Sequence, residues 1–89
     1  MSTTVTIWNG ADCTGSRGPT TNLNAPVCGT LGSGSVKSIQ YSGVPNKIEF
    51  YVSGGAHDNC SNGSQASRGG GSGCVTAPAG FNWESVRIT

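Results

Sequence analysis

The chain contains 89 residues, of which 34% are hydrophobic and 10% are charged, and its formal net charge at pH 7 is +1. A chain of this length buries only about 60–65% of its unfolded surface, which excludes two independent cores and predicts a single domain, 1–89. Its five basic residues are scattered and do not form the basic face of a nucleic-acid-binding protein. No apolar run approaches the ~20 residues of a membrane-spanning helix, so we expect neither a nucleic-acid partner nor a membrane span.

Four stretches alternate apolar and polar residues with the period of two that half-buried β-strands require. In chain order they are 4–8 (TVTIW), 38–41 (SIQY), 47–52 (KIEFYV) and 85–88 (SVRI). The segments between them are rich in Gly, Asn, Pro and Ser, which favour turns, and no helical face is visible. Within one such segment, 68–73 (RGGGSG) is typical of a flexible hairpin tip. The sequence therefore predicts an all-β protein.

The second half of the chain repeats the pattern of the first at a spacing of 47 positions. At this spacing Cys13 corresponds to Cys60, and in each half an apolar–aromatic pair precedes the cysteine and a glycine follows it. The closing strands contribute Val36, Ser38, Ile39 and Tyr41 in the first half and Trp83, Ser85, Val86 and Ile88 in the second. Features that recur in the same order indicate an internal duplication. We interpret the chain as repeat 1 at 3–41, a linker at 42–46 and repeat 2 at 47–89.

Four cysteines in a small chain of low charge indicate a disulfide framework and an oxidising compartment. No Cys-x-x-Cys is present and His57 is the only histidine, which disfavours a zinc site. Of the three possible connectivities, Cys13–Cys28 with Cys60–Cys74 alone yields two equivalent, self-contained units, and we expect that pairing. Each bridge would close a loop of about 15 residues, which is worth about 3 kcal/mol in the chain-entropy description.

The same features predict a secreted, extracellular protein. Met1 leads directly into the first predicted strand, so we expect a mature form with an added initiator Met. Asn59 and Asn62 each begin an N-glycosylation sequon, which suits a secretory route, although such tripeptides also arise by coincidence in a chain this rich in Asn and Ser.

Each half carries a recognisable arrangement around its hairpin and its closing strand. The segment 6–15 (TIWNGADCTG) places Trp8, Cys13 and Gly15 in the pattern aromatic–x4–hydrophobe–x–Gly, and 35–41 (SVKSIQY) closes the half. The second half has 50–63 (FYVSGGAHDNCSNG), with about four extra residues in the hairpin, and 82–88 (NWESVRI). This arrangement resembles the βγ-crystallin Greek-key motif, duplicated, in its small, disulfide-bonded, killer-toxin-like branch. The resemblance implies a β-sandwich of two four-stranded Greek keys, in which Ser38 and Ser85 brace the hairpins.

Many proteins of that family bind calcium, and the resemblance points to the positions that would hold the ion. They are Ser33, Gly34 and Lys37 in the first half and Gly80, Phe81 and Glu84 in the second. Calcium prefers six to eight oxygen ligands with carboxylates among them, and the paired acidic residues are missing here. We therefore expect no metal and no cofactor, and an ion pair between Lys37 and Glu84 in place of calcium.

The ionisable residues do not form a catalytic pattern. The four carboxylates are Asp12, Glu49, Asp58 and Glu84. None is paired for acid–base chemistry, and His57, Asp58 and Ser61 are neighbours on one predicted turn, whereas a triad needs groups held by separate segments. We expect no enzymatic activity and no catalytic residue.

We expect the function to lie in exposed loops, because loops on a rigid scaffold commonly carry binding residues. Repeat 2 has an unmatched insertion at 53–73. Its candidate binding residues are His57, Asp58, Asn59 and Arg68. Trp8 and Trp83 are expected to anchor the core or a hairpin, which is the commoner use of tryptophan.

These observations favour a small secreted, non-enzymatic binding protein of the toxin, antimicrobial or inhibitor type. It would act through surface loops on a cell-envelope or protein target. One alternative is a carbohydrate-binding lectin, because Asn, Asp and aromatic side chains in loops bind sugar hydroxyls. A second alternative is a structural or weakly calcium-binding crystallin-like protein.

Overall fold

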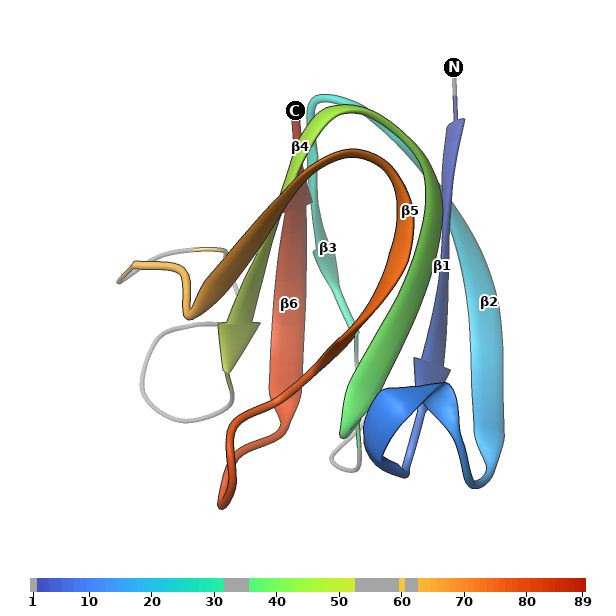
Figure 1. Ribbon diagram of the computed structural model, residues 1–89. Coiled ribbons are helices and arrows are strands. Elements are labelled where there is room, and N and C mark those ends of the chain that lie inside the picture. The colour runs from blue at the N-terminus through green and yellow to red at the C-terminus, as the bar shows by residue number, and fades with distance from the viewer. Residues whose placement is uncertain (1, 32–35, 53–59, 61–62) are drawn as a thin grey trace.

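The computed structural model describes residues 2–31, 36–52, 60 and 63–89 of the chain. These residues form an all-β protein (Figure 1). It has six antiparallel strands and one short 3-10 turn, η1. The elements are β1 (Ser2–Trp8), η1 (Ala11–Cys13), β2 (Arg17–Asn24), β3 (Val27–Thr30), β4 (Ser38–Val52), β5 (Ala66–Thr76) and β6 (Trp83–Ile88). The all-β prediction is confirmed, and the four predicted strands lie in β1, β4 and β6. In the described part of the chain, no helix is long and apolar enough to cross a membrane.

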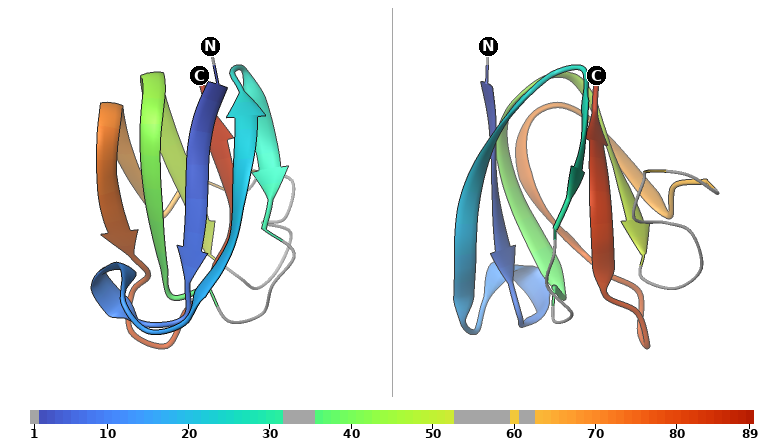
Figure 2. Two further views of the ribbon diagram at one scale, coloured as in Figure 1. Left: turned by 90° about the vertical axis from the view of Figure 1, so that its right-hand side faces the viewer. Right: turned by 180° about the vertical axis from the view of Figure 1, so that it is seen from behind.

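The 15-residue strand β4 organises the sheet. Its first half pairs with β1, its second half pairs with β6, and β5 pairs with it on both sides of the bend. Figures 1 and 2 show that β4 and β5 bend together, which places β1 and β2 in one layer and β6 and β3 in the other. The segment 42–46, interpreted as the linker between the repeats, is not a separate turn, because these residues continue β4 through the bend. Two register shifts of the β4–β5 ladder and the positive φ of Gly43 lie there.

The chain crosses between the layers a second time from β2 to β3. A cis Ala25-Pro26 bond lies at this crossing, and β2 and β3 then form the outer strands of the order β2-β1-β4-β6-β3. Gly29 of β3 permits the two strands to approach, because a Cβ at this position would lie 2.8 Å from Cδ1 of Leu23. The sheet thus folds back on itself, as the two views of Figure 2 show. The apolar side chains between its layers are buried.

The inward positions of the alternating strands form one core between the layers. Its fully buried side chains include Trp83, Phe50, Ile39, Ile48 and Ile88. The Phe50 ring contacts those of Tyr41 and Trp83, with centroids 5.8 and 5.3 Å apart, and the indole N–H of Trp83 donates to the Val75 carbonyl at 3.0 Å. The prediction that Trp83 anchors the core is confirmed. Each such side chain contributes roughly 1.5–3 kcal/mol relative to an exposed position.

Both disulfides connect the first half of the chain with the second. The pairs are Cys13–Cys74 and Cys28–Cys60, so the predicted pairing of Cys13 with Cys28 and of Cys60 with Cys74 is wrong. The cause is the strand order, because β3 carries Cys28 to β6, and the end of β5 carries Cys74 to the first half of β4. The bridges span 61 and 32 positions, and loops of this length correspond to about 4 kcal/mol each in the chain-entropy description.

Three strands lie in segments that were expected to be turns. β2 and β3 occupy the stretch between Cys13 and Cys28 and just beyond it, and 68–73 lies inside β5 and is not a hairpin tip. Most side chains of β2 and β5 are exposed, so these strands lack the apolar alternation by which a half-buried strand is recognised. β2 and β5 form because their backbone N–H and C=O groups pair with those of β1 and β4. The side chains of their glycines and threonines do not by themselves indicate a strand.

The disulfide connectivity predicts a specific pattern of linked tryptic peptides. Cleavage after the basic residues separates the four cysteines into peptides 1–17, 18–37, 48–68 and 69–87. Mass spectrometry of an unreduced digest, prepared at low pH with blocked thiols, should detect 1–17 joined to 69–87 and 18–37 joined to 48–68. The reduced digest, in which all four run separately, is the control. A link between 1–17 and 18–37 would contradict the fold, because it needs Cys28 beside Cys13.

Candidate functional site

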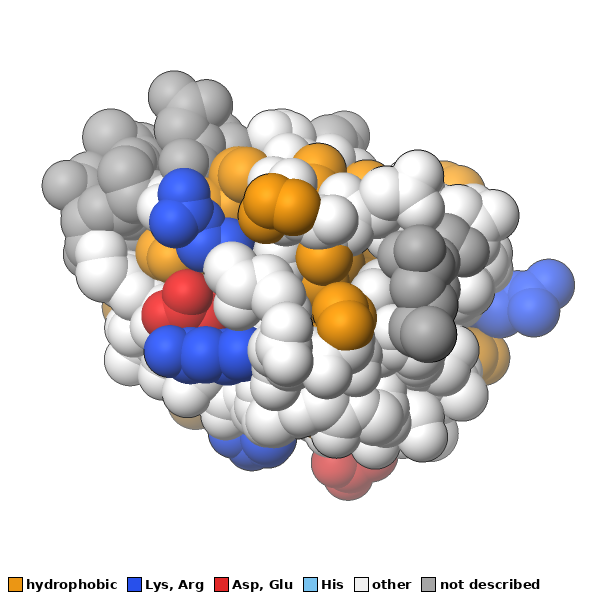
Figure 3. All heavy atoms as spheres, turned by 90° about the horizontal axis from the view of Figure 1, so that it is seen from above, with side chains coloured by type: hydrophobic (Ala, Val, Ile, Leu, Met, Phe, Trp, Pro, Cys, Tyr) orange, Lys and Arg blue, Asp and Glu red, His pale blue; other side chains and the backbone are white. Residues whose placement is uncertain are grey.

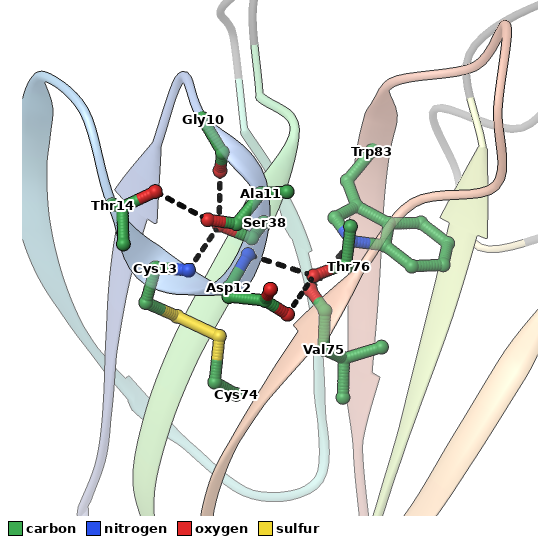
Figure 4. The surroundings of a disulfide bond; sticks show 10 residues. All are labelled: Gly10, Ala11, Asp12, Cys13, Thr14, Ser38, Cys74, Val75, Thr76 and Trp83. Atoms are coloured by element: carbon green, nitrogen blue, oxygen red, sulfur yellow. Dashed lines mark hydrogen bonds between the residues drawn. A yellow bond between two sulfur atoms is a disulfide. The ribbon is translucent and has the colours of Figure 1, made fainter.

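We call the layer with β1 and β2 the first layer and the layer with β6 and β3 the second. The hairpin between β1 and β2 folds over the outer face of the first layer and is held there by Ser38. The fully buried Ser38 hydroxyl donates to the Gly10 carbonyl at 2.6 Å and accepts from the Cys13 N–H at 2.8 Å, as Figure 4 shows. The expectation that Ser38 braces a hairpin is confirmed. Ser85 is equally buried and lies opposite Tyr51 in the ladder, but the hairpin that it was expected to brace falls outside the described residues.

A second set of contacts ties the same hairpin to β5. The Asp12 N–H donates to the Thr76 hydroxyl at 2.9 Å, and that hydroxyl donates to the Asp12 carboxylate at 3.3 Å. The Cys13–Cys74 disulfide runs beside these bonds (Figure 4). Asp12 and Cys13 both have left-handed φ values, 56° and 55°, a conformation that residues other than glycine adopt when surrounding contacts hold it. The hairpin is therefore fixed to both β4 and β5.

An open depression of about 680 Å³ lies beside this hairpin, on the outer face of β1, β4 and the end of β5. Tyr41, Gly73 and the Cys13–Cys74 disulfide line part of it. The rest of its lining is six polar side chains, those of Thr4, Thr6, Arg17, Gln40, Ser42 and Ser72. Thr4 donates to Asn22 at 3.1 Å and Thr6 shares a 2.9 Å hydrogen bond with Thr20, so these two hydroxyls are engaged along the sheet. The other four polar side chains are exposed and make no side-chain hydrogen bond or ion pair within the described residues.

Arg17 is the only charged side chain among the described residues that line this depression. The outer face of the second layer carries charges of both signs. Lys47 lies 3.6 Å from Glu49, and Glu49 lies opposite Arg87 in the ladder. In the view of Figure 3, basic and acidic side chains lie next to one another on one side, and much of the remaining visible surface is uncharged. Burial raises the pKa of the nearby Tyr51, the Glu49 charge raises it further, and Arg87 opposes the shift.

Of the four predicted binding residues, one lies within the described chain. Arg68 is an exposed residue of β5 opposite Ile48, and its guanidinium donates to the Ser67 carbonyl at 2.7 Å. It is not among the residues that line the depression. His57, Asp58 and Asn59 fall outside the described residues, as does the sequon residue Asn62.

Sequence reasoning missed the residues of the depression, although the signal was present. Thr4, Thr6 and Gln40 occupy the polar positions of the same alternation that predicted the strands, whereas Ser42 lies in the segment interpreted as the linker. In a strand these positions point away from the core and share one face. The sequence could not show that β1 and β4 are neighbours, and that pairing is what brings Thr6 opposite Gln40.

Lys37 binds backbone carbonyls instead of an acidic side chain. Its ammonium donates to the carbonyls of Pro78 at 3.0 Å and Phe81 at 3.4 Å, in the segment between β5 and β6. The predicted ion pair with Glu84 is wrong, because the strand order places Lys37 against the end of β5, where the Ala77 N–H donates to its carbonyl. Within the described residues, no group of three or more His, Cys, Asp or Glu side chains could hold a metal ion.

Replacing Ser38 with alanine tests the hairpin anchor. The variant would leave the Gly10 carbonyl and the Cys13 N–H without their buried partner, and we expect the free energy of unfolding to fall by about 2 kcal/mol. Urea denaturation of the oxidised protein measures the change. The exposed Ser67 of β5 provides a matched control, because Ser67→Ala should stay within about 0.5 kcal/mol of the original protein. Equal losses in both variants would show that the Ser38 contacts carry no special weight.

Comparison with known protein families gives a match over most of the chain. The model of the family ARB_05566_N, described as an N-terminal domain, matches residues 4–88. No curated protein and no solved structure gives a significant match. Because the matched region covers nearly all of the described strands, the chain belongs to the ARB_05566_N family of N-terminal domains.

Proposed function

We propose that this protein is a secreted, non-enzymatic binding domain, built from two equivalent Greek-key units of the βγ-crystallin type. The strand pairing supports the two-unit architecture. β1 pairs with β2 and with the first half of β4, and the second half of β4 pairs in the same way with β5 and with β6. The third strand of each unit, β3 or the end of β5, then joins the layer of the other unit.

Register and backbone conformation support the same architecture. Cys28 lies opposite Arg87, and Cys74 lies opposite Gln40, which precedes Arg87 by the repeat spacing of 47 positions. Cys13 and Cys60 have nearly the same φ, 55° and 53°. Each disulfide joins the hairpin cysteine of one unit to the third-strand cysteine of the other, so exchanging the units converts one bond into the other.

The observation that carries the binding function is the open depression beside a covalently fixed hairpin. Arg17, Gln40, Ser42 and Ser72 present donors and acceptors that no described residue satisfies, on strands whose positions the core and Cys13–Cys74 determine. A prearranged surface binds at a lower entropic cost than a mobile one. Its described lining includes no carboxylate or imidazole for proton transfer, which favours binding over catalysis.

Two disulfides in a domain of this size favour an extracellular role. The targets that we propose are components of a cell envelope or an exposed protein, contacted by the depression and by exposed residues such as Arg68. A protein of this kind acts as a toxin, an antimicrobial or an inhibitor by occupying its target.

Cosedimentation with insoluble cell-wall preparations tests this function. The oxidised protein should pellet with yeast or bacterial walls and should slow the growth of the cells that supplied them, because its binding surface is exposed and preformed. An unrelated protein of similar size and charge serves as the control for trapping. If the protein stays in the supernatant with every wall preparation and growth is unchanged, the proposed function is wrong.

A calcium-stabilised structural role is the weaker proposal. The Lys37 ammonium donates hydrogen bonds to the carbonyls of Pro78 and Phe81, so a cation is already present beside Phe81, one of the positions that the resemblance assigns to calcium. We expect millimolar calcium chloride to leave the Tm unchanged relative to magnesium chloride. Lys37→Met should lower the free energy of unfolding by about 1.5 kcal/mol, since hydrogen bonds from a charged group are lost. Lys47→Met is the matched control, because the Lys47 side chain is 53% exposed and its ion pair with Glu49 contributes little. A Tm that rises with calcium alone would favour the structural role.

A further inference from the structure

We infer that the depression on the outer face of β1, β4 and the end of β5 is a binding site for a carbohydrate chain. This inference rests on the proposed binding function and names the ligand class and the face that binds it. It concerns the face lined by Arg17, Gln40, Ser42 and Ser72, and it does not involve Arg68.

The lining matches the chemistry of sugars. A carbohydrate presents hydroxyl groups that both donate and accept hydrogen bonds, with few charges. Gln40 offers two donors and an acceptor, Ser42 and Ser72 each offer a hydroxyl of both kinds, and Arg17 offers donors at the edge of the face. These groups are exposed and without partners in the described chain, so binding a sugar would break no hydrogen bond within it.

The shape of the depression favours a chain over a single buried sugar. Its volume of about 680 Å³ is open to solvent and extends over three strands and the start of β2. The Thr4–Asn22 and Thr6–Thr20 hydrogen bonds hold neighbouring side chains along the same face, so the surface under the ligand is ordered in advance. An extended ligand can lie across such a face and contact several of its polar groups at once.

The equivalent face of the other layer shows that the scaffold does not require this composition. The pair Thr6 and Gln40 of the first layer corresponds in the ladder to Glu49 and Arg87 of the second. At these positions one layer carries uncharged hydrogen-bonding groups, and the other carries opposite charges that can satisfy each other. Both layers enclose the same core, so packing does not explain the difference. The outer face of the first layer, on which Arg17 is the one charged side chain among the described residues of the depression, is the face with unsatisfied groups available for a ligand.

Other classes of partner fit the depression less well. Nucleic acid would require several cations, and Arg17 is the only one among the described lining residues. Tight protein interfaces depend on exposed aromatic or aliphatic anchors. Among the described residues the one exposed large hydrophobic side chain is Phe81, at 48% exposure, and it does not line the depression.

Affinity electrophoresis through gels that contain laminarin, chitosan, mannan, xylan or pectin tests the inference. We expect at least one of these polysaccharides to retard the oxidised protein. The double variant Gln40→Ala/Ser42→Ala should weaken that retardation by about tenfold in Kd, because it removes two of the exposed hydrogen-bonding groups. Ser72→Tyr should also weaken it, because a bulky side chain would occupy the depression. Both changes are at exposed positions, and unchanged Tm values would verify the fold.

Arg87→Ala is the matched control, since Arg87 occupies the equivalent position to Gln40 in the other layer. It should retain the original retardation. If no polysaccharide retards the protein while it still pellets with cell walls, the carbohydrate inference is wrong and the proposed function stands. Retardation that is equal in the original protein and in both depression variants would place the site elsewhere and would also overturn the inference. If the original protein shows neither wall binding nor retardation, both the proposed function and the carbohydrate inference are wrong.

Discussion

The hydrogen-bond ladder of β4 holds the two layers of this protein together. A strand has two edges, and in β4 one edge serves β5 on both sides of the bend, while the other is divided between β1 and β6. Separating the layers would therefore break the strand that both contain. The bend also directs the core, because Tyr41 before it and Phe50 after it bring their rings to 5.8 Å from each other. Backbone pairing and apolar burial thus favour the same folded sheet.

The disulfides follow from this arrangement. In the proposed two-unit architecture, the third strand of each unit lies in the layer of the other, and its cysteine meets the hairpin of that other unit. Neither bond is local, and each constrains a long stretch of the unfolded chain. The hairpin that Ser38 and Cys74 hold in place is also the wall of the depression, so the same contacts that stabilise the domain shape its candidate binding surface.

The two outer faces show how one scaffold can carry different chemistry. Ladder positions that are uncharged on the first layer, such as Gln40, carry charge on the second, as Arg87 does. Outward side chains of a sheet are largely independent of the core, so they can differ between equivalent positions at little cost in stability. The proposed carbohydrate site makes use of this independence, since its groups contribute to recognition and not to packing.

The sequence by itself determined the strand class and the inward residues. Alternation of apolar and polar residues is a local property, and it correctly indicated β1, both halves of β4 and β6 with their buried side chains. The role of Ser38 as a hairpin anchor could also be anticipated, because a buried hydroxyl needs a backbone partner.

Only the tertiary structure decided which strands are neighbours, and with them the disulfides and the depression. The local pattern predicts that each half is self-contained and that Cys13 is bonded to Cys28. In the structure, the crossing of β3 and β5 between layers brings Cys13 to Cys74 instead. The exposed strands β2 and β5 have no apolar alternation to reveal them. The unsatisfied groups of Gln40 and Ser72 become one surface only when β4 and β5 pair, and a pairing between distant segments is a property of the folded chain that no local stretch contains.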